Sequence, residues 1–407
     1  MDRLKAWFAS KLEKIRGSIA FWPSLMAFGF VLTAISLRSI GQEILGPIFE
    51  DFLPFLLISD REVALSLLTT ITGGLISMMV FSFSMVMVLL SNATSNLSPR
   101  LLPSLIGSRN HQIVLGMYLG TIMFNIIVAM GFDLSDESSE FSSVAVAIAV
   151  ILGIVCLAMF VTFIHNVSRS IQVGVVLKDE HTRTLRAIEG ISERNDKSNS
   201  LCPPSYDDLA VYSCSQTGFF QGIDDDALAA FAKKHDAKIY ITSLRGLHQI
   251  EGDPTLKYSC TGDDEEFKDK LAEFLQYDST QLTHKYYAHG IERMVEVAVR
   301  ALSPGINDPG TALTSIDFLK NVFVKMIRLE EWEVVYDKDD EPRIWLRLEK
   351  WESLLKKEIL SIYNYGKGDY SIILRLIYIL EVLKEKVPKD QTERIEVLDE
   401  LLEKIGK

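Results

Sequence analysis

The chain has 407 residues, of which 48% are hydrophobic, and a formal net charge of −12 at pH 7. This length is enough for a membrane part and a soluble part, and most charged residues lie after His165. The soluble half is acidic, which excludes nucleic acid as a partner because phosphate binding needs clustered Lys and Arg side chains. The four cysteines include no C-x-x-C pair, so we expect free thiols and no cofactor.

The chain begins with a basic, amphipathic N-terminal segment over residues 1–18. An apolar run follows over residues 19–37, in an order of charged and apolar residues that a signal peptide shares. No small-residue cleavage site is evident, which favours a retained first membrane helix. Residues 38–59 contain Pro47 and Pro54 and several acids, so we expect this segment to lie in the outer membrane interface.

The rest of the chain is organised around the stretch from Asp60 to Arg100. Residues 63–90 contain no acid or base, and this run is longer than the roughly 20 residues that cross a bilayer. The predicted helix continues to residue 98, where Pro99 ends it. Small and hydroxylated residues recur along it at steps of seven, which keeps them on one stripe. These predicted pore-lining residues are Ser66, Thr70, Gly73, Ser77, Ser84, Ser91 and Ser98.

Two interpretations of this stripe stay open. Small residues let helices pack closely in lipid, so the pattern is typical of tight packing within one subunit. It is also typical of a pore, because hydroxyl groups solvate ions and identical copies around an axis form rings. Asp60 and Glu62 would then form an acidic outer mouth that favours cations. None of the four apolar runs contains a charged residue, which argues against a pump.

Two more apolar runs complete a predicted transmembrane domain over residues 19–165. Its four transmembrane helices are predicted at 19–37, 63–90, 113–130 and 144–164. Lys and Arg residues gather in the N-terminal segment, between the second and third helices, and after the fourth. Both termini and the soluble half are therefore expected to be cytoplasmic. Arg100, His165 and Arg169 would lie at the inner boundary, as headgroup anchors or as part of a gate.

The soluble half changes its pattern along the chain. Residues 166–191 are predicted to form a connecting helix, and residues 206–262 a small β-containing insert. The pattern over 263–407 is helical. The predicted fold class is thus an α-helical integral membrane protein with four transmembrane helices and a mixed α/β, mainly helical cytoplasmic C-terminal domain.

Two clusters in the helical part are candidate sites. His289, Glu292 and Glu296 put an imidazole and two carboxylates on one helix face, which favours either a divalent-cation site or an ordinary ion-paired surface. The second cluster is the corner SPGINDPGTA, where one helix stops and Asp308 caps the next. It is predicted to be a packing joint or a ligand-binding or subunit contact. Its residues are Ser303, Pro304, Gly305, Asn307, Asp308 and Pro309.

Catalytic motifs are absent: we find no G-x-S-x-G, no H-E-x-x-H and no P-loop pattern, so we do not expect an enzyme.

Four passages carry a family resemblance, namely LSPRLL at 97–102, LGMYLGTIMFN at 115–125, FIHNVSRSIQV at 163–173 and ALSPGINDPGTA at 301–312. Through them the chain resembles the bacterial predicted membrane proteins grouped as domain of unknown function 2254. The resemblance implies a multi-span inner-membrane protein with a cytoplasmic C-terminal region, and it implies no activity.

These observations predict a homo-oligomeric inner-membrane ion channel that conducts cations. Its pore would be lined by the 60–98 helix, and its cytoplasmic domain would act as a gate or sensor. The alternative is a non-conducting, membrane-anchored signalling or assembly scaffold, and a membrane-surface hydrolase is a more distant one. The expected partners are the lipid bilayer, a permeant cation and further copies of the same chain.

Overall fold

The structure is a computed structural model. It describes residues 21–52, 54–58, 60–96, 109–131, 143–170, 172–196, 209–261, 264–279 and 286–406. The chain divides into two compact units, Met1–Gln172 and Val173–Lys407, and each has buried apolar clusters of its own.

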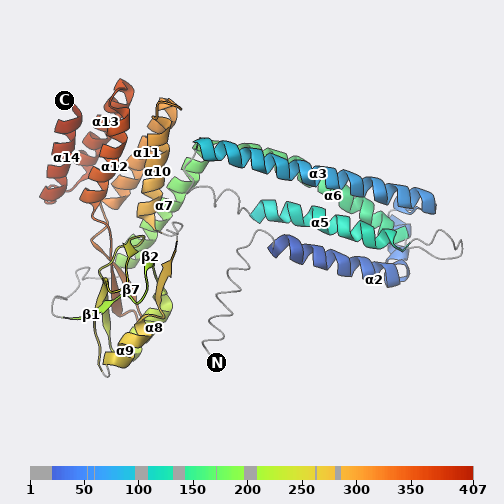
Figure 1. Ribbon diagram of the computed structural model, residues 1–407, viewed down its shortest axis with the longest axis horizontal. Helices are drawn as coiled ribbons and strands as arrows, with labels where there is room; N and C mark the ends of the chain where they lie inside the picture. Colours follow the sequence, from blue (N-terminus) through green and yellow to red (C-terminus); the bar gives the residue numbers. More distant parts are fainter. Residues whose placement is uncertain are drawn as a thin grey trace. The chain divides into compact units, whose positions relative to one another are not determined.

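The first unit is a bundle of long helices (Figure 1). They are α2 (Phe21–Phe52), α3 (Arg61–Asn96), α5 (Arg109–Ala129) and α6 (Ser143–Ser170). Three stretches are long and apolar enough to cross a membrane, namely Arg61–Val88, Gln112–Ala129 and Ser143–Val167. The apolar stretch of α2, Phe21–Leu37, is shorter. Three of the four predicted spans therefore meet the length criterion, and the first remains a prediction.

Helix α2 runs further than the sequence suggested. It continues to Phe52 with Pro47 inside it, and a short 3₁₀ turn, Pro54–Leu56, follows. A proline inside a helix removes one backbone hydrogen bond and tends to kink it. Here the helix persists through Pro47 instead of breaking into a separate piece.

Close helix contacts hold the bundle together, and glycines on α5 allow the closest of them. A Cβ atom added at Gly116 would lie 2.8 Å from Met26 Sδ, and one at Gly120 would lie 2.8 Å from the Phe30 ring. Gly116 and Gly120 thus form a small-xxx-small seam against α2. On another side of α5, the amide of Asn125 donates a hydrogen bond to Thr72 Oγ1 of α3 at 3.2 Å. Asn125 therefore links two helices, as expected for a buried amide in a membrane bundle.

The second unit contains a layer of helices (Figure 1). They are α7 (Val173–Asn195), α10 (Tyr287–Ala301), α11 (Pro309–Met326), α12 (Trp351–Gly366), α13 (Tyr370–Lys386) and α14 (Thr392–Gly406). Helix α7 packs against α10 and α11, and its approach to α10 depends on Gly290. A Cβ atom there would lie 2.0 Å from Thr184 Oγ1, so any side chain at this position would force the two helices apart.

The same unit contains two sheets. The first has the strand order β1-β5-β3-β8-β7, in which β3 and β8 are parallel and the other neighbours antiparallel. Its strands are β1 (Ala210–Ser213), β3 (Lys238–Ile241), β5 (Pro254–Ser259), β7 (Trp332–Tyr336) and β8 (Pro342–Arg347). The second sheet has the order β4-β2-β6, with β2 (Gly218–Ile223), β4 (His248–Gln249) and β6 (Leu275–Asp278). Two helices, α8 (Asp225–Lys234) and α9 (Asp264–Leu271), lie between strands in the chain.

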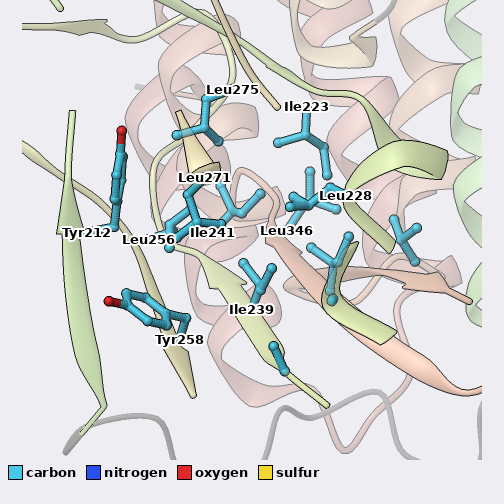
Figure 2. Packing of buried hydrophobic residues seen from close by; sticks show 14 of the residues in the cluster. Tyr212, Ile223, Leu228, Ile239, Ile241, Leu256, Tyr258, Leu271, Leu275 and Leu346 are labelled. Carbon is cyan, nitrogen blue, oxygen red and sulfur yellow. The ribbon is translucent and has the colours of Figure 1, made fainter. Parts of the chain in front are cut away.

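A shared apolar core joins these sheets and helices (Figure 2). Ile239 and Ile241 of β3 pack there with Leu346 of β8 and Leu228 of α8. Strands β6, β7 and β8 lie in the part of the chain whose pattern was expected to be helical. They are short, and β7 and β8 are rich in Val, Ile, Trp and Tyr, which suit a pleated surface.

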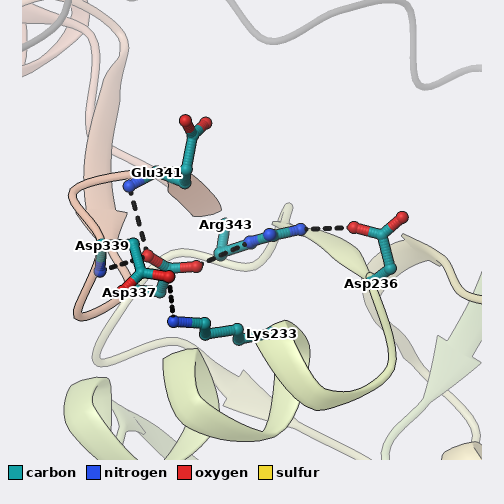
Figure 3. Close-up of polar contacts among 6 residues, drawn as sticks. All are labelled: Lys233, Asp236, Asp337, Asp339, Glu341 and Arg343. Atoms are coloured by element: carbon teal, nitrogen blue, oxygen red, sulfur yellow. Dashed lines mark hydrogen bonds and ion pairs between the residues drawn. The ribbon is translucent and has the colours of Figure 1, made fainter.

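The turn between β7 and β8 is fixed by polar contacts (Figure 3). The Asp337 carboxylate accepts hydrogen bonds from the backbone N–H groups of Asp339 at 2.8 Å and Glu341 at 3.2 Å, and from Arg343 Nε at 3.0 Å. Arg343 Nη1 also donates to Asp236 after α8, at 2.8 Å. The acids of this turn therefore bind protein donors and tie the hairpin to α8.

Candidate functional site

The predicted stripe lies on the outer face of α3. Leu68 and Leu75 are buried and mark the side of α3 that packs in the bundle. Ser66 and Ser84 lie nine residues on either side of Leu75, about two and a half turns, and so occupy the opposite face. The stripe residues from Ser66 to Ser91 are all exposed, and Ser98 lies outside the described residues. Among the described residues, the stripe from Ser66 to Ser91 is therefore not packed between helices of the same chain.

The side chains of the stripe on this face of α3 are small and mostly polar. A Cβ atom added at Gly73 would meet no atom within 4 Å, and Ser77 Oγ donates to the Gly73 carbonyl at 2.9 Å. Large apolar side chains, including Phe81 and Met87, flank the stripe and are also exposed. Helix α3 thus presents a narrow hydroxylated strip between flanks suited to lipid.

The two acids of the predicted outer mouth lie at the start of α3. Asp60 caps the helix, because its Oδ1 accepts the Val63 N–H at 3.1 Å. Glu62 lies in the first turn, four residues before Ser66 and so on the stripe side. Both acids are exposed.

The predicted inner boundary is described only in part. His165 lies exposed near the end of α6. Arg100 and the side chain of Arg169 lie outside the described residues, so their part in a gate stays a prediction.

In the predicted cation cluster on α10, Glu292 contacts the buried His289 and a lysine of α12. His289 Nδ1 lies 3.4 Å from Glu292 Oε2, and Lys357 Nζ lies 2.6 Å from Glu292 Oε1. The hydrogen bond to His289, and then the one from Lys357, lower the pKa of Glu292 to about 2. Over the described parts of the chain, no group of three His, Cys, Asp or Glu side chains is placed to hold a metal ion. Glu296 thus does not complete a cation site with His289 and Glu292.

The predicted corner between α10 and α11 has the expected backbone. Helix α10 stops at Ala301, Asp308 is the N-cap of α11, and Pro309 is its first residue. Asn307 has a φ of 49°, in the left-handed region that Asn tolerates. Residues from Pro304 to Asp308 are exposed, so this part of the corner is a surface turn, and its role as a packing joint or contact stays a prediction.

The second unit also contains a charged cavity that the sequence did not predict. Its volume is about 550 Å³, which is in the range of roughly 300 to 1,000 Å³ typical of small-molecule pockets. Its walls come from α7, the β2–α8 junction, the loop before β4, strands β6 and β7, and the start of α10. The lining includes Arg186, Gly190, Arg194, Gln221, Gly222, Asp224, Asp225, Asp226, Arg245, Gly246, Gln276, Tyr286, His289 and Glu333.

One residue of the cavity wall is a buried carboxylate. Glu333 of β7 is 0% exposed and pairs with Arg194 through Oε1. Its Oε2 lies 3.3 Å from Arg245 Nη1 and accepts no hydrogen bond from the described residues. Two guanidinium groups thus flank one buried carboxylate, and the side chain of Arg194 is itself 43% exposed. Burial also raises the pKa of the neighbouring Asp225, which favours its neutral form.

Arg245 is held in place from several sides. Its guanidinium lies over the Tyr286 ring, 5.9 Å from the centroid, and Glu333 pairs with it. A Cβ atom at Gly222 would lie 3.2 Å from Arg245 Nε, and the φ of Gly222 is +130°. Glycine is needed here because of both the conformation and the close approach. The side chain is therefore preorganised to present its N–H groups to the cavity.

Helix α7 forms one wall of the cavity and is anchored at both ends. Near its start, the buried Glu180 accepts two hydrogen bonds from Arg293 Nη1 of α10, at 3.0 and 3.1 Å. At its end, the Asn195 side chain pairs with the backbone of the edge strand β7, donating to the Trp332 carbonyl at 2.9 Å and accepting from Val334 N–H at 3.1 Å. The cavity-facing residues of α7 thus have fixed positions.

No local pattern in the sequence signals this cavity. Its charged residues come from separate segments, and only the spacing of Arg186, Gly190 and Arg194 by four shows that they share a helix face. Pairing of Arg245 with Glu333 depends on the sheet in which β8 lies between β3 and β7.

The fold and its apolar helices define the chain as a mostly helical membrane protein with a mixed α/β second unit. It belongs to the family described as predicted membrane proteins of domain of unknown function 2254, whose sequence profile matches residues 16–382. An uncharacterised protein of Mycobacterium tuberculosis is 23% identical over 347 residues, and one of Mycobacterium bovis is 24% identical over 350. Each alignment covers 82% of this chain, which spans 66% of the length of these relatives. No solved structure matches the chain.

Proposed function

We propose that the protein is a homo-oligomeric ion channel of the bacterial inner membrane, selective for cations. The chain crosses the membrane four times, with both termini and the second unit in the cytoplasm. Copies of α3 surround the pore, and the second unit gates it or senses a signal. The single observation that supports this proposal most is the position of the hydroxylated stripe, which faces away from the rest of its own bundle.

Lipid tails are a poor environment for the stripe. A face of serine, threonine and glycine gains little from lipid tails, whereas flanking Phe81 and Met87 suit them well. Identical copies around a symmetry axis would bring the stripes together, with their apolar flanks against neighbouring copies or lipid. Hydroxyl rings then line the axis, and Asp60 and Glu62 surround its outer end.

The proposal is tested by thiol accessibility together with conductance. Cysteines in the variants Thr70→Cys, Ser77→Cys, Ser84→Cys and Ser91→Cys should react with a water-soluble thiol reagent in native membranes. Phe83→Cys is the matched control, since Phe83 is also exposed on α3 but lies off the stripe. Leu75→Cys and Val86→Cys should likewise stay unreactive. The purified protein should conduct cations in planar bilayers and migrate as an oligomer.

The scaffold is the rival function, and one observation favours it. Ser77 already donates its hydroxyl to the Gly73 carbonyl, so this side chain needs no aqueous partner. Unreactive stripe cysteines and the absence of any bilayer conductance would replace the channel with a non-conducting, membrane-anchored scaffold.

A further inference from the structure

The charged cavity of the second unit has the features of a ligand site that the pore does not explain. It combines a fully buried carboxylate with preorganised guanidinium groups, and Glu333 Oε2 accepts no hydrogen bond from the described residues. Its ion pair with Arg245 Nη1 at 3.3 Å compensates the charge of this oxygen, but a buried carboxylate oxygen also needs a hydrogen-bond donor, and a buried guanidinium N–H needs an acceptor. Arg194 Nε is such a group, since it has no acceptor among the described residues. The end of the cavity at Glu333 and Arg194, its deep end, therefore suits a ligand that offers a hydrogen-bond donor beside a hydrogen-bond acceptor.

The spacing of the cavity-lining residues along α7 indicates the length of the ligand. Arg186, Gly190 and Arg194 follow one another at intervals of four residues, so they lie along one face of the helix. Eight residues of helix span about 12 Å. Gly190 lies between the two arginines, and a Cβ atom there would meet nothing within 4 Å. The recess over Gly190 can thus hold an elongated ligand with one end at the exposed Arg186 and the other at the buried Glu333.

Charge differs between the two ends. The deep end holds Arg194, Arg245 and Glu333, whose carboxylate and guanidinium groups suit a neutral ring edge with both donors and acceptors. Arg186 at the mouth is exposed and suits an anionic group, because guanidinium binds phosphate with paired hydrogen bonds. Asp224 and Asp226 are exposed at the same mouth and repel a phosphate, so the phosphate must pair directly with Arg186.

We propose that this cavity binds a purine nucleoside monophosphate, with its base at Arg245 and Glu333 and its phosphate on Arg186. A guanine edge fits the deep end best, because its N–H groups can donate to a carboxylate while O6 accepts from a guanidinium. The base would lie near the Tyr286 ring and the Arg245 plane, which are surfaces on which bases stack. The volume of about 550 Å³ accommodates a nucleotide and far exceeds what inorganic phosphate needs.

Isothermal titration calorimetry on the purified full chain in detergent tests this site, with GMP, AMP, guanosine, glutamate and inorganic phosphate as probes. GMP should bind more tightly than AMP, and glutamate and inorganic phosphate should give no measurable binding. The variant Gly190→Leu fills the recess and should weaken GMP binding about tenfold or more. Gly174→Leu is the matched control, because Gly174 also lies on α7 in open space but does not line the cavity.

A second pair of variants locates the phosphate. Arg186→Gln should weaken GMP binding about tenfold but leave guanosine binding unchanged, because only GMP carries the phosphate. Arg183→Gln removes the same charge from another exposed position of α7 and should leave both unchanged. The site is overturned if GMP and AMP fail to bind the wild-type chain, if glutamate binds in their place, or if Gly190→Leu has no effect. These results do not depend on conductance, so the cavity and the pore can fail separately.

Discussion

Asp308 shows how one side chain shapes the corner between α10 and α11. Its Oδ1 accepts the Thr311 N–H at 3.1 Å, and its Oδ2 accepts the Thr311 hydroxyl at 2.6 Å. These hydrogen bonds lower the pKa of Asp308. Asp308→Ala should therefore reduce the free energy of unfolding of the second unit by about 1 kcal/mol, the usual contribution of an N-cap. Chemical denaturation of the full chain in detergent measures this difference.

The pH dependence of the same variant follows from the direction of the shift. A carboxylate whose pKa is lowered by folding stabilises the fold above its unfolded pKa, which is about 3.9 for Asp. The difference in the free energy of unfolding between wild type and Asp308→Ala should thus be largest near neutral pH and shrink as the pH falls below about 4. Asp308→Asn should retain most of the stability, because Asn caps helices about as well. An Asn variant as unstable as the Ala variant would contradict the capping role.

For single residues, the sequence predicted correctly those features that depend only on neighbouring positions in the chain. The Asp308 cap and the Pro309 start of α11 follow from adjacent residues, and the structure has both. The pairing of His289 with Glu292 was also a local signal, but Lys357 of α12 takes one oxygen of that carboxylate. A residue 65 positions away thus decided between a cation site and an ion pair, and no spacing rule could have revealed it.

At the scale of elements, the seam between α2 and α5 should be sensitive to added volume. Gly120→Ala would place a methyl group within 2.8 Å of the Phe30 ring, and overpacking of this kind costs about 1–3 kcal/mol. We expect a lower midpoint of thermal unfolding for the detergent-solubilised chain. Gly29→Ala is the control, because a Cβ atom at Gly29 meets nothing within 4 Å. Adding Phe30→Leu to Gly120→Ala should recover part of the loss, and a Gly120→Ala chain as stable as wild type would contradict the close seam.

Long apolar helices were the elements that the sequence predicted best. The runs at 63–90, 113–130 and 144–164 correspond to α3, α5 and α6, because uninterrupted hydrophobicity is a strong signal. Strands β7 and β8 were missed, since they are short and belong to a sheet whose other strands lie before residue 260. Their partners are set by the parallel pairing of β3 with β8, which is a long-range contact. The cavity depends on that pairing, so it was missed with them.

At the scale of the whole molecule, the acids at the start of α3 should control conduction. Asp60 and Glu62 are exposed and precede the stripe, so symmetric copies would surround the outer mouth with negative charge. Such a ring concentrates cations, and salt screens its attraction over a Debye length of about 10 Å at 0.1 M. We therefore expect Asp60→Asn combined with Glu62→Gln to lower single-channel cation conductance mainly at low ionic strength.

The double variant Asp60→Asn, Glu62→Gln removes charge from the mouth without disrupting the fold of α3. Asn replaces Asp at the N-cap with little loss, so Asp60→Asn should leave the start of α3 intact. The combined change Asp390→Asn and Glu396→Gln removes the same charge from exposed positions of the second unit and should leave conductance unchanged. The difference between the two double variants should be large near 0.01 M salt, where the Debye length is about 30 Å, and small near 1 M, where it is about 3 Å. An equal loss of conductance at every salt concentration would instead mean that the mouth variant alters the pore itself, and would remove the acidic ring from the mechanism.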